Sequence, residues 1–204
     1  MDRIPNKTDN IDPVASTAAR RPSWRMAQAV IAACAMLAAC GPGEEGKARE
    51  LVDGFYKMHQ AANPAGAFTL KGLISFRPFF SVPLFDLLKD VSVAEEARAT
   101  QVADEPPPLV RGDMFTANPA GATAYRVLRC QTQEREGNCT VELTQNDAKA
   151  GGAAKWTDQV VLTRDARGWI IDNIRFAGGP APMREGDMQA MLRKLLKQDV
   201  PPLQ

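Results

Sequence analysis

Among the side chains of this sequence that could do chemistry are four cysteines and one histidine. Cys34 and Cys40 lie in the N-terminal segment, whereas Cys130 and Cys139 lie where two strand-like runs meet. In an exported chain such an even pair predicts a disulfide. By the chain-entropy model a loop this small contributes about 2–3 kcal/mol to stability. Two cysteines and His59 are too few ligands for a zinc ion, so we predict no metal and no cofactor.

Two side chains are candidates for proton transfer. His59 falls on the apolar face of a predicted helix, where it could be a base in a pocket or could cap or pack the helix end. Asp158 could serve if burial shifted its pKa, but it could also form a structural ion pair with Arg175 of a neighbouring strand. The sequence contains no Gly-x-Ser-x-Gly, no phosphate loop and no His-rich metal spacing. We therefore expect no catalytic residue.

The segment that ends at Cys40 indicates where the protein is located. Residues 26–39 are an apolar run that follows Arg25 and has Gln28 as its only polar residue. The run is too short for a hydrocarbon core of about 30 Å, but it suits the apolar region of a signal peptide. It closes with Leu-Ala-Ala-Cys-Gly at positions 37–41, which resembles the lipobox of bacterial lipoprotein precursors.

This resemblance implies that the chain is cut before Cys40, which is then acylated on its thiol and on its new amino terminus. Residues 1–39 would be the signal peptide, residues 40–46 a lipidated tether, and residues 47–204 a single domain. Gly41 after the cysteine implies sorting to the periplasmic face of the outer membrane. Two alternatives stay open: a buried Ala-rich helix at residues 26–39, and twin-arginine export directed by residues 20–21.

Charge limits the range of partners. Without residues 1–39 the chain carries 20 Lys and Arg against 21 Asp and Glu. Nucleic-acid binding needs a basic surface that neutralises phosphates, so we expect no nucleic-acid partner. The same balance gives no reason to expect attraction to anionic lipid. The expected membrane contact is therefore the lipid anchor itself.

The first part of the domain has helical periodicity. Residues 48–59 alternate apolar and charged side chains at three- and four-residue steps and predict an amphipathic helix that ends near Asn63. Residues 68–88 are the most apolar part of the mature chain. Pro78 and Pro83 divide them, because proline is tolerated at a turn or in a first helical turn but not inside a helix.

The next segments complete the helical prediction. A helix is expected from about residue 83 to residue 98, with Ser81 as its cap. Residues 101–114 contain three consecutive prolines and predict a linker over the surface. Residues 187–198 carry an apolar stripe and predict a last helix, which docks on its own sheet or on a partner.

Four strand-like runs lie between these segments. Short connections, such as residues 165–168, predict an antiparallel sheet. A longer hairpin loop is expected at residues 145–154, and Gly178 is expected to stop the sheet. The class is thus α+β. The four runs are residues 124–130, 139–143, 156–164 and 169–176.

Five short segments stand out within these elements: Phe55-Tyr56, GDMFT at 112–116, GATAYRV at 121–127, WTD at 156–158 and GWIIDNIRF at 168–176. Together they resemble a family of small bacterial envelope proteins of unknown function. The resemblance implies a nuclear-transport-factor-two-like cone, in which N-terminal helices pack on a curved four-stranded antiparallel sheet and a C-terminal helix follows. Recurring positions, together with His59, are the candidates for lining a ligand cavity: Tyr56, Phe115, Trp156, Asp158, Trp169, Asp172 and Arg175.

These observations predict a lipid-anchored periplasmic binding module without catalytic activity. Its partner would be a protein or a small ligand held by the mouth of the cone or by the sheet. A sharper hypothesis is an inhibitor or immunity protein that neutralises a toxin directed at the cell wall. Two alternatives are a cavity enzyme, an isomerase or hydrolase with His59 or Asp158 as base, and a structural envelope lipoprotein.

Overall fold

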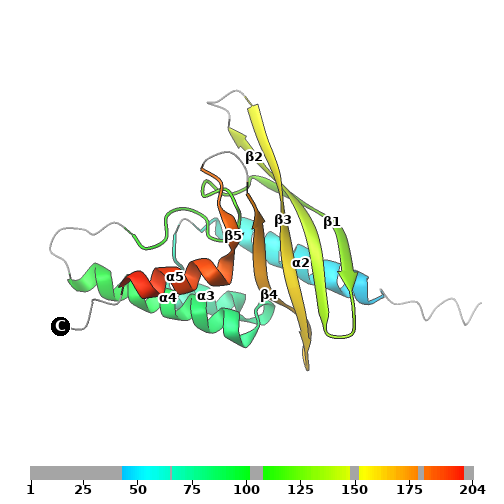
Figure 1. The fold of residues 1–204 in the computed structure, drawn as a ribbon, viewed down its shortest axis with the longest axis horizontal. Helices are drawn as coiled ribbons and strands as arrows, with labels where there is room; N and C mark the ends of the chain where they lie inside the picture. The colour runs from blue at the N-terminus through cyan, green and yellow to red at the C-terminus, as the bar shows by residue number, and fades with distance from the viewer. Residues whose placement is uncertain (1–42, 65, 102–107, 148–151, 179–181, 200–204) are drawn as a thin grey trace, which may run out of the picture. The chain divides into compact units, whose positions relative to one another are not determined.

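The computed structural model describes residues 43–64, 66–101, 108–147, 152–178 and 182–199. The expected signal peptide and Cys40 lie outside these residues. Figure 1 shows the elements in chain order. They are α2 (Glu44–Ala62), α3 (Leu70–Phe76), the 3-10 turn η1 (Arg77–Phe79), α4 (Val82–Gln101), β1 (Ala124–Thr132), β2 (Glu136–Asp147), β3 (Gly152–Asp165), β4 (Gly168–Ala177), β5 (Glu185–Asp187) and α5 (Met188–Asp199). Within the described part of the chain, no helix is long and apolar enough to cross a membrane.

The strands form one antiparallel sheet in the order β1-β2-β3-β4-β5. The α+β class is therefore confirmed, but the expected count of four strands is corrected to five. The sheet does not stop at Gly178, because the chain returns and pairs β5 with the end of β4. The sequence Glu-Gly-Asp of β5 has no apolar alternation, which is why the pattern missed it. The loop between β2 and β3 is also shorter than predicted, since the two strands pair as far as Asp147 and Gly152.

Helix α2 begins earlier than predicted. Glu44, Glu45 and Gly46 belong to its first turn, so these three residues are not part of a flexible tether. Two acidic side chains at a helix N-terminus are favourable, because they face the positive end of the helix dipole. The helix ends as expected at Asn63, whose left-handed backbone (φ 42°) allows its N–H to bond the carbonyl of His59.

The other helical predictions are largely confirmed. Helix α3 ends just before Pro78. Helix α4 begins beside Ser81, whose hydroxyl accepts the N–H of Leu84 at 3.3 Å. The predicted surface linker is wrong over its second half, because Val110, Asp113 and Met114 are buried. Distant side chains draw that segment into the core, as described below.

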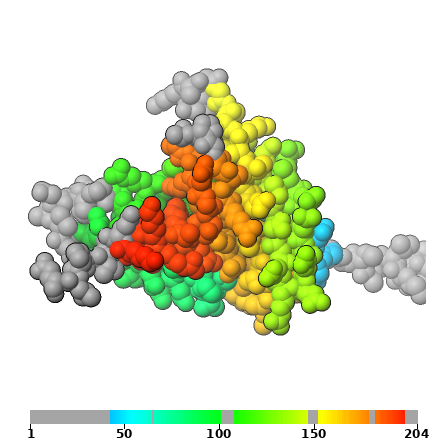
Figure 2. Space-filling model, viewed as in Figure 1, coloured from blue at the N-terminus to red at the C-terminus, as the bar shows by residue number. Residues whose placement is uncertain are grey.

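Helices cover one face of the sheet. Helix α2 packs on β1, β2 and β4, while α4 and α5 lie side by side and contact β4. Helix α5 thus docks on its own domain, with Met188 and Leu192 fully buried. No helix of the described residues covers the opposite face of β1, β2 and β3 (Figure 2). We call it the open sheet face.

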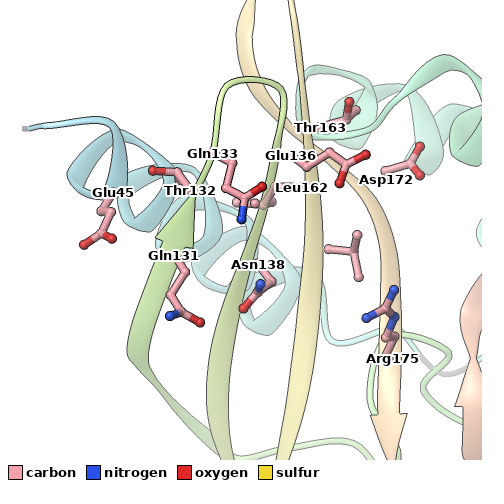
Figure 3. Close-up of a pocket in the computed structure, with 12 residues that line it drawn as sticks. Glu45, Gln131, Thr132, Gln133, Glu136, Asn138, Leu162, Thr163, Asp172 and Arg175 are labelled. Atoms are coloured by element: carbon pink, nitrogen blue, oxygen red, sulfur yellow. The ribbon is translucent and has the colours of Figure 1, made fainter.

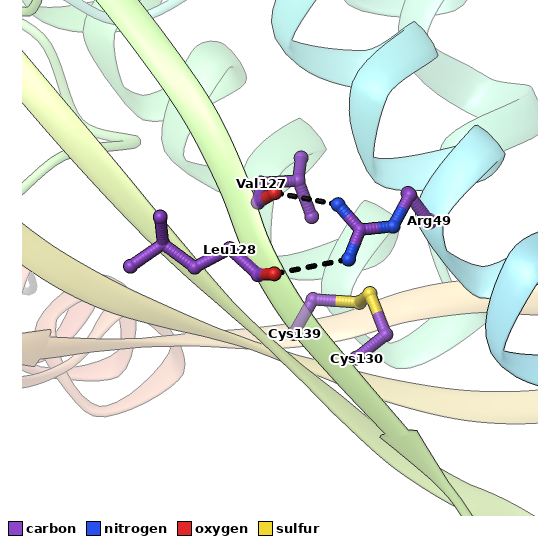
Figure 4. Close-up of a disulfide and its surroundings, with 5 residues drawn as sticks. All are labelled: Arg49, Val127, Leu128, Cys130 and Cys139. Carbon is purple, nitrogen blue, oxygen red and sulfur yellow. Dashed lines mark hydrogen bonds between the residues drawn. A yellow bond between two sulfur atoms is a disulfide. The ribbon is translucent and has the colours of Figure 1, made fainter.

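The predicted disulfide is present. Cys130 and Cys139 are directly opposite each other on β1 and β2, with their Cα atoms 4.0 Å apart. Next to them β1 bulges between Val127 and Arg129. Arg49 of α2 donates to the carbonyls of Val127 and Leu128 at 2.5 and 3.0 Å (Figure 4). The disulfide and Arg49 together hold the edge strand on the sheet and on α2.

Reducing this disulfide is expected to lower the free energy of unfolding by about 2–3 kcal/mol, because the reduced unfolded chain regains loop entropy. Urea unfolding with and without a thiol reductant measures the difference. A variant with both Cys130→Ala and Cys139→Ala is the control, and reductant should leave its midpoint unchanged. A wild-type urea midpoint that stays the same after complete reduction of the disulfide would contradict the expectation.

Asp187 joins β5 to α5. Its carboxylate accepts the N–H of Ala190 and the amide of Asn173, both at 2.9 Å. Burial alone would raise the pKa of Asp187, but these hydrogen bonds outweigh burial and hold the pKa below its ordinary value. Asp187 is therefore the N-cap of α5 and is ionised at neutral pH.

Replacing Asp187 by alanine is expected to cost about 1 kcal/mol at neutral pH, as for other helix N-caps. A carboxyl with a lowered pKa stabilises the fold above its unfolded value, about 3.9 for Asp, and that contribution is lost as the pH falls through the lowered folded value. The gap between wild type and variant should therefore shrink in acid. Thermal unfolding across pH measures it, with the exposed Glu185→Ala as control. A gap that widens in acid would contradict the cap.

Candidate functional site

A buried histidine–aspartate pair lies where α2 ends. His59 Nε2 is 3.0 Å from both carboxylate oxygens of Asp113, and both side chains are more than nine-tenths buried. The ring of His59 stacks on Phe55 and meets the edge of Phe115, with centroids 5.9 and 5.5 Å apart. The pair thus packs against the aromatic core on one side and lines a cleft on the other.

This cleft has a volume of about 550 Å³. His59 and Asp113 line it together with backbone, amide and hydroxyl groups and small apolar side chains, and no other described residue of the lining carries a formal charge. Neutral hydrogen-bonding groups of this kind suit a polar ligand better than an apolar one. The other lining residues are Gln60, Asn63, Pro64, Gly112, Pro119, Ala120, Gly121, Ala122, Thr123 and Gln145.

Asp113 belongs to a loop, residues 108–123, that is fixed by many hydrogen bonds. Its carboxylate accepts the N–H of Phe115 at 2.8 Å, and its own N–H donates to the carbonyl of Pro119 at 2.8 Å. From outside the loop, Arg184 donates to the carbonyl of Asp113, to that of Arg111 at 2.7 Å and to that of Thr116 at 3.2 Å. Burial lowers the pKa of Arg184, and the charge of Asp113 counteracts this.

Asp158 holds the same loop from the sheet. Its fully buried carboxylate accepts the N–H of Ala117 at 2.9 Å, that of Ala177 at 3.3 Å and the indole N–H of Trp156 at 3.1 Å. Burial raises the pKa of Asp158, although all three hydrogen bonds act in the opposite direction. Because these donors occupy both oxygens, Asp158 is placed to link the loop to β3 and β4 rather than to take a proton from a ligand.

The predicted ion pair of Asp158 with Arg175 is wrong. In the register of β3 and β4, Asp158 is opposite Phe176, whereas Arg175 is opposite Gln159. Successive side chains of a strand point to opposite faces, so Asp158 points into the core and Arg175 is exposed on the open sheet face.

The eight candidate cavity residues do not form one cavity. Tyr56, His59, Phe115, Trp156 and Asp158 come together inside the core. Trp169 is buried at the other end of the sheet, where its indole donates to Glu44 at 3.0 Å. Asp172 and Arg175 line a second cleft, of about 570 Å³, on the open sheet face (Figure 3). Asp172 reaches that cleft as the extra residue where the pairing of β4 shifts between Ile171 and Asn173.

The interior expected of a cone is filled by aromatic rings. Phe115 is fully buried, and its ring stacks almost parallel to Phe80 with centroids 5.8 Å apart. Tyr56 stacks on Tyr125, and its buried hydroxyl has no hydrogen-bond partner among the described residues. Burial, followed by the charges of Asp158 and Asp113, raises the pKa of Tyr56 well above its ordinary value, so it stays a neutral phenol. Rings that contact Phe115 belong to Phe55, His59, Phe68, Phe76 and Phe80.

Sequence reasoning missed two residues of the site, Asp113 and Arg184. Asp113 was assigned to a surface linker, and Arg184 follows the point where the sheet was expected to stop. Their partners are distant in sequence: 54 residues separate His59 from Asp113, and 71 separate Asp113 from Arg184. Two local signals existed for Asp113: its place in the segment 112–116, which stood out in the sequence, and the turn chemistry of Gly112 before it and of Asn118 and Gly121 after it.

Comparison with protein-family models, with curated proteins and with solved structures gives no match for this chain. Among the described residues, no three His, Cys, Asp or Glu side chains come together as metal ligands would.

Proposed function

We propose that this chain is a lipid-anchored binding module of the bacterial envelope, which holds a protein partner on its surface. The observation that carries the proposal is the filled interior. Stacked aromatic rings occupy the space between helices and sheet that a cone enzyme would use for a substrate, with Phe55, Phe80 and Phe115 fully buried. Ligand contact then falls to the surface clefts and the open sheet face.

The nuclear-transport-factor-two-like cone remains part of this proposal. Support comes from the helices on one face of an antiparallel sheet and from the short connections between its strands. The chain would then have the helices and sheet of that fold but no interior cavity. Such a protein need not be an enzyme, because a fold does not by itself imply catalysis.

An inhibitor or immunity protein against a cell-wall-directed toxin is the sharper form of the proposal. Stoichiometric blocking needs a rigid surface. Two features make the described domain rigid: the disulfide of the edge strand and the loop fixed by Arg184 and Asp158. Rigid surfaces bind with less loss of conformational entropy. Several acyl chains, each worth about 0.8 kcal/mol per buried methylene, would keep the protein permanently at the membrane.

The binding proposal is tested by affinity capture from envelope extracts with the soluble domain, residues 41–204. A partner that is captured saturably supports it. Arg175→Glu reverses a charge on the open sheet face, and Lys71→Glu reverses one on α3 as a matched control. A partner that docks on the sheet is lost with the first variant only. If no partner is captured in repeated experiments, and loss of the protein visibly alters the cell envelope, a structural envelope lipoprotein would be favoured.

The anchor has a test of its own. Mass spectrometry of native protein should find an acylated amino terminus at Cys40, and Cys40→Ser should leave the full precursor unacylated. Membrane fractionation should place the wild type with the outer membrane. A native chain that keeps its precursor end would contradict the anchor.

The histidine–aspartate pair favours a cavity enzyme as the second candidate. A carboxylate 3.0 Å from His59 Nε2 would hold the ring in one orientation, as the third group of a base-assisted site does. The cleft beside it could admit a polar substrate. Turnover of a small substrate that is lost in His59→Ala and kept in Gln60→Ala would establish this candidate over the binding module.

A further inference from the structure

Three segments distant in sequence meet at one end of the domain, which we call the hairpin pole. It comprises the start of α2, the turn between β1 and β2, and the turn between β3 and β4. Glu44 bonds Arg164 at 2.9 Å and the indole of Trp169 at 3.0 Å. The N–H of Arg164 donates to the carbonyl of Arg135 at 3.0 Å. Figure 1 shows α2 starting at the end of the sheet where β1 turns into β2.

The hairpin pole is the part of the domain closest along the chain to the proposed anchor. Helix α2 begins at Glu44, so only residues 41–43 separate it from Cys40. Fully extended, that connection reaches about 14 Å. His59 lies about 22 Å farther along the helix axis, at 1.5 Å for each of the residues that follow Glu44. A tether this short would keep the start of α2 within reach of the bilayer.

The surface of the hairpin pole carries both cations and carboxylates, which complement the two charges of a zwitterionic headgroup. A cleft of about 650 Å³ contains three cations, Lys47, Arg164 and Arg167, and three carboxylates, Glu44, Glu50 and Asp165. Lys47, Arg164 and Arg167 keep 41–55% of their side-chain surface exposed although each is paired with a carboxylate. Such a balanced set offers guanidinium groups to a phosphate and carboxylates to an ammonium. It gives no net attraction to anionic lipid.

We propose that the hairpin pole of the anchored protein binds zwitterionic phospholipid headgroups, which seat the domain upright on the membrane. The proposal rests on the lipid anchor of the proposed function. It assigns the cleft of Lys47, Arg164 and Arg167 to the headgroup layer, and it leaves the His59–Asp113 cleft and the open sheet face available to a partner.

Site-specific quenching tests the proposal on the acylated full protein in phosphatidylethanolamine–phosphatidylcholine vesicles. With Cys40 acylated and Cys130 bonded to Cys139, an introduced cysteine is the one free thiol of the mature chain. A fluorophore at Ala166→Cys marks the exposed β3–β4 turn, and one at Ala120→Cys marks the exposed rim of the His59–Asp113 cleft. Lipids with a nitroxide on the headgroup should remove most of the fluorescence at position 166 and none at position 120.

A longer tether separates headgroup binding from simple proximity. A Gly/Ser insert as long as α2, placed between Gly43 and Glu44, should leave the quenching at position 166 intact if the cleft binds headgroups. Adding Arg167→Glu to the long-tether protein should then abolish it, whereas Lys89→Glu on α4 should not. Quenching that disappears with the long tether alone, or that is equal at positions 120 and 166, would overturn the proposal.

The same samples show which proposal has failed. Mass spectrometry reports acylation at Cys40 independently of the fluorescence. An unacylated chain contradicts the lipid anchor of the proposed function. An acylated chain with an unquenched label at position 166 contradicts the headgroup contact alone.

Discussion

Replacing Phe115 by alanine is expected to lower the free energy of unfolding by about 3–5 kcal/mol, the range for removing a buried aromatic ring. Phe115 is fully buried and contacts the rings of Phe55 and Phe80, with centroids 5.4 and 5.8 Å away. Phe55 belongs to α2 and Phe80 to the segment between η1 and α4, so the two rings are held separately and cannot both collapse into the space left behind. For a domain of this size, the loss corresponds to a fall in melting temperature of about 10 °C.

Ile74→Ala is the matched control for Phe115→Ala. Ile74 lies on α3 and is 66% exposed, so its truncation should change stability by no more than about 0.5 kcal/mol. Urea unfolding followed by tryptophan fluorescence measures both variants. A loss below about 1 kcal/mol for Phe115→Ala would show that the core closes around the missing ring, and the interior would then not be rigidly filled.

Periodicity predicted most of the elements because most of them bury one face. Helix α2 buries Val52, Phe55 and His59 at three- and four-residue steps. Strand β3 buries alternate residues from Trp156 to Leu162. These patterns reflect local geometry and need no knowledge of the partner. The same reasoning predicted the disulfide, because Cys130 and Cys139 lie on the two strands of one predicted hairpin.

Contacts between distant segments could not be predicted in this way. Residues 108–123 have no regular period, so periodicity did not predict that they enter the core. They enter because His59, Asp158 and Arg184 satisfy their backbone and side-chain groups from three other elements. Buried polar groups need such partners, but the spacing of nearby residues does not show which distant residue will be the partner.

The error over Asp158 and Arg175 has a related cause. Both strands were identified correctly, and opposite charges on neighbouring strands suggested a pair. Register decides which faces they share, and the shift in β4 beside Asp172 changes that register by one residue. A shift of one residue moves a side chain to the other face. Sequence patterns locate strands far better than they locate such irregularities.

Gly112→Ala is expected to have an effect as large as that of Phe115→Ala, although it adds only one methyl group. Gly112 has φ +71°, and a Cβ there would lie 2.0 Å from the carbonyl oxygen of Pro119. That carbonyl accepts the N–H of Asp113 at 2.8 Å. The backbone must move, which leaves a buried donor unsatisfied at a cost of about 1–3 kcal/mol, in addition to about 1–3 kcal/mol for the strained backbone.

Gly168→Ala separates these two contributions. Gly168 also has a positive φ, +108°, but a Cβ there meets nothing within 4 Å. Gly168→Ala should therefore lower the free energy of unfolding only by the cost of the strained backbone, about 1–3 kcal/mol. Gly112→Ala should lower it further, by the cost of the broken hydrogen bond. Urea unfolding gives the difference. Because the same movement displaces Asp113 from His59, only Gly112→Ala should change the chemical shifts of the His59 ring. Equal losses for the two variants, with an unchanged His59 signal, would mean that the loop of residues 108–123 adapts freely and does not hold the pair in place.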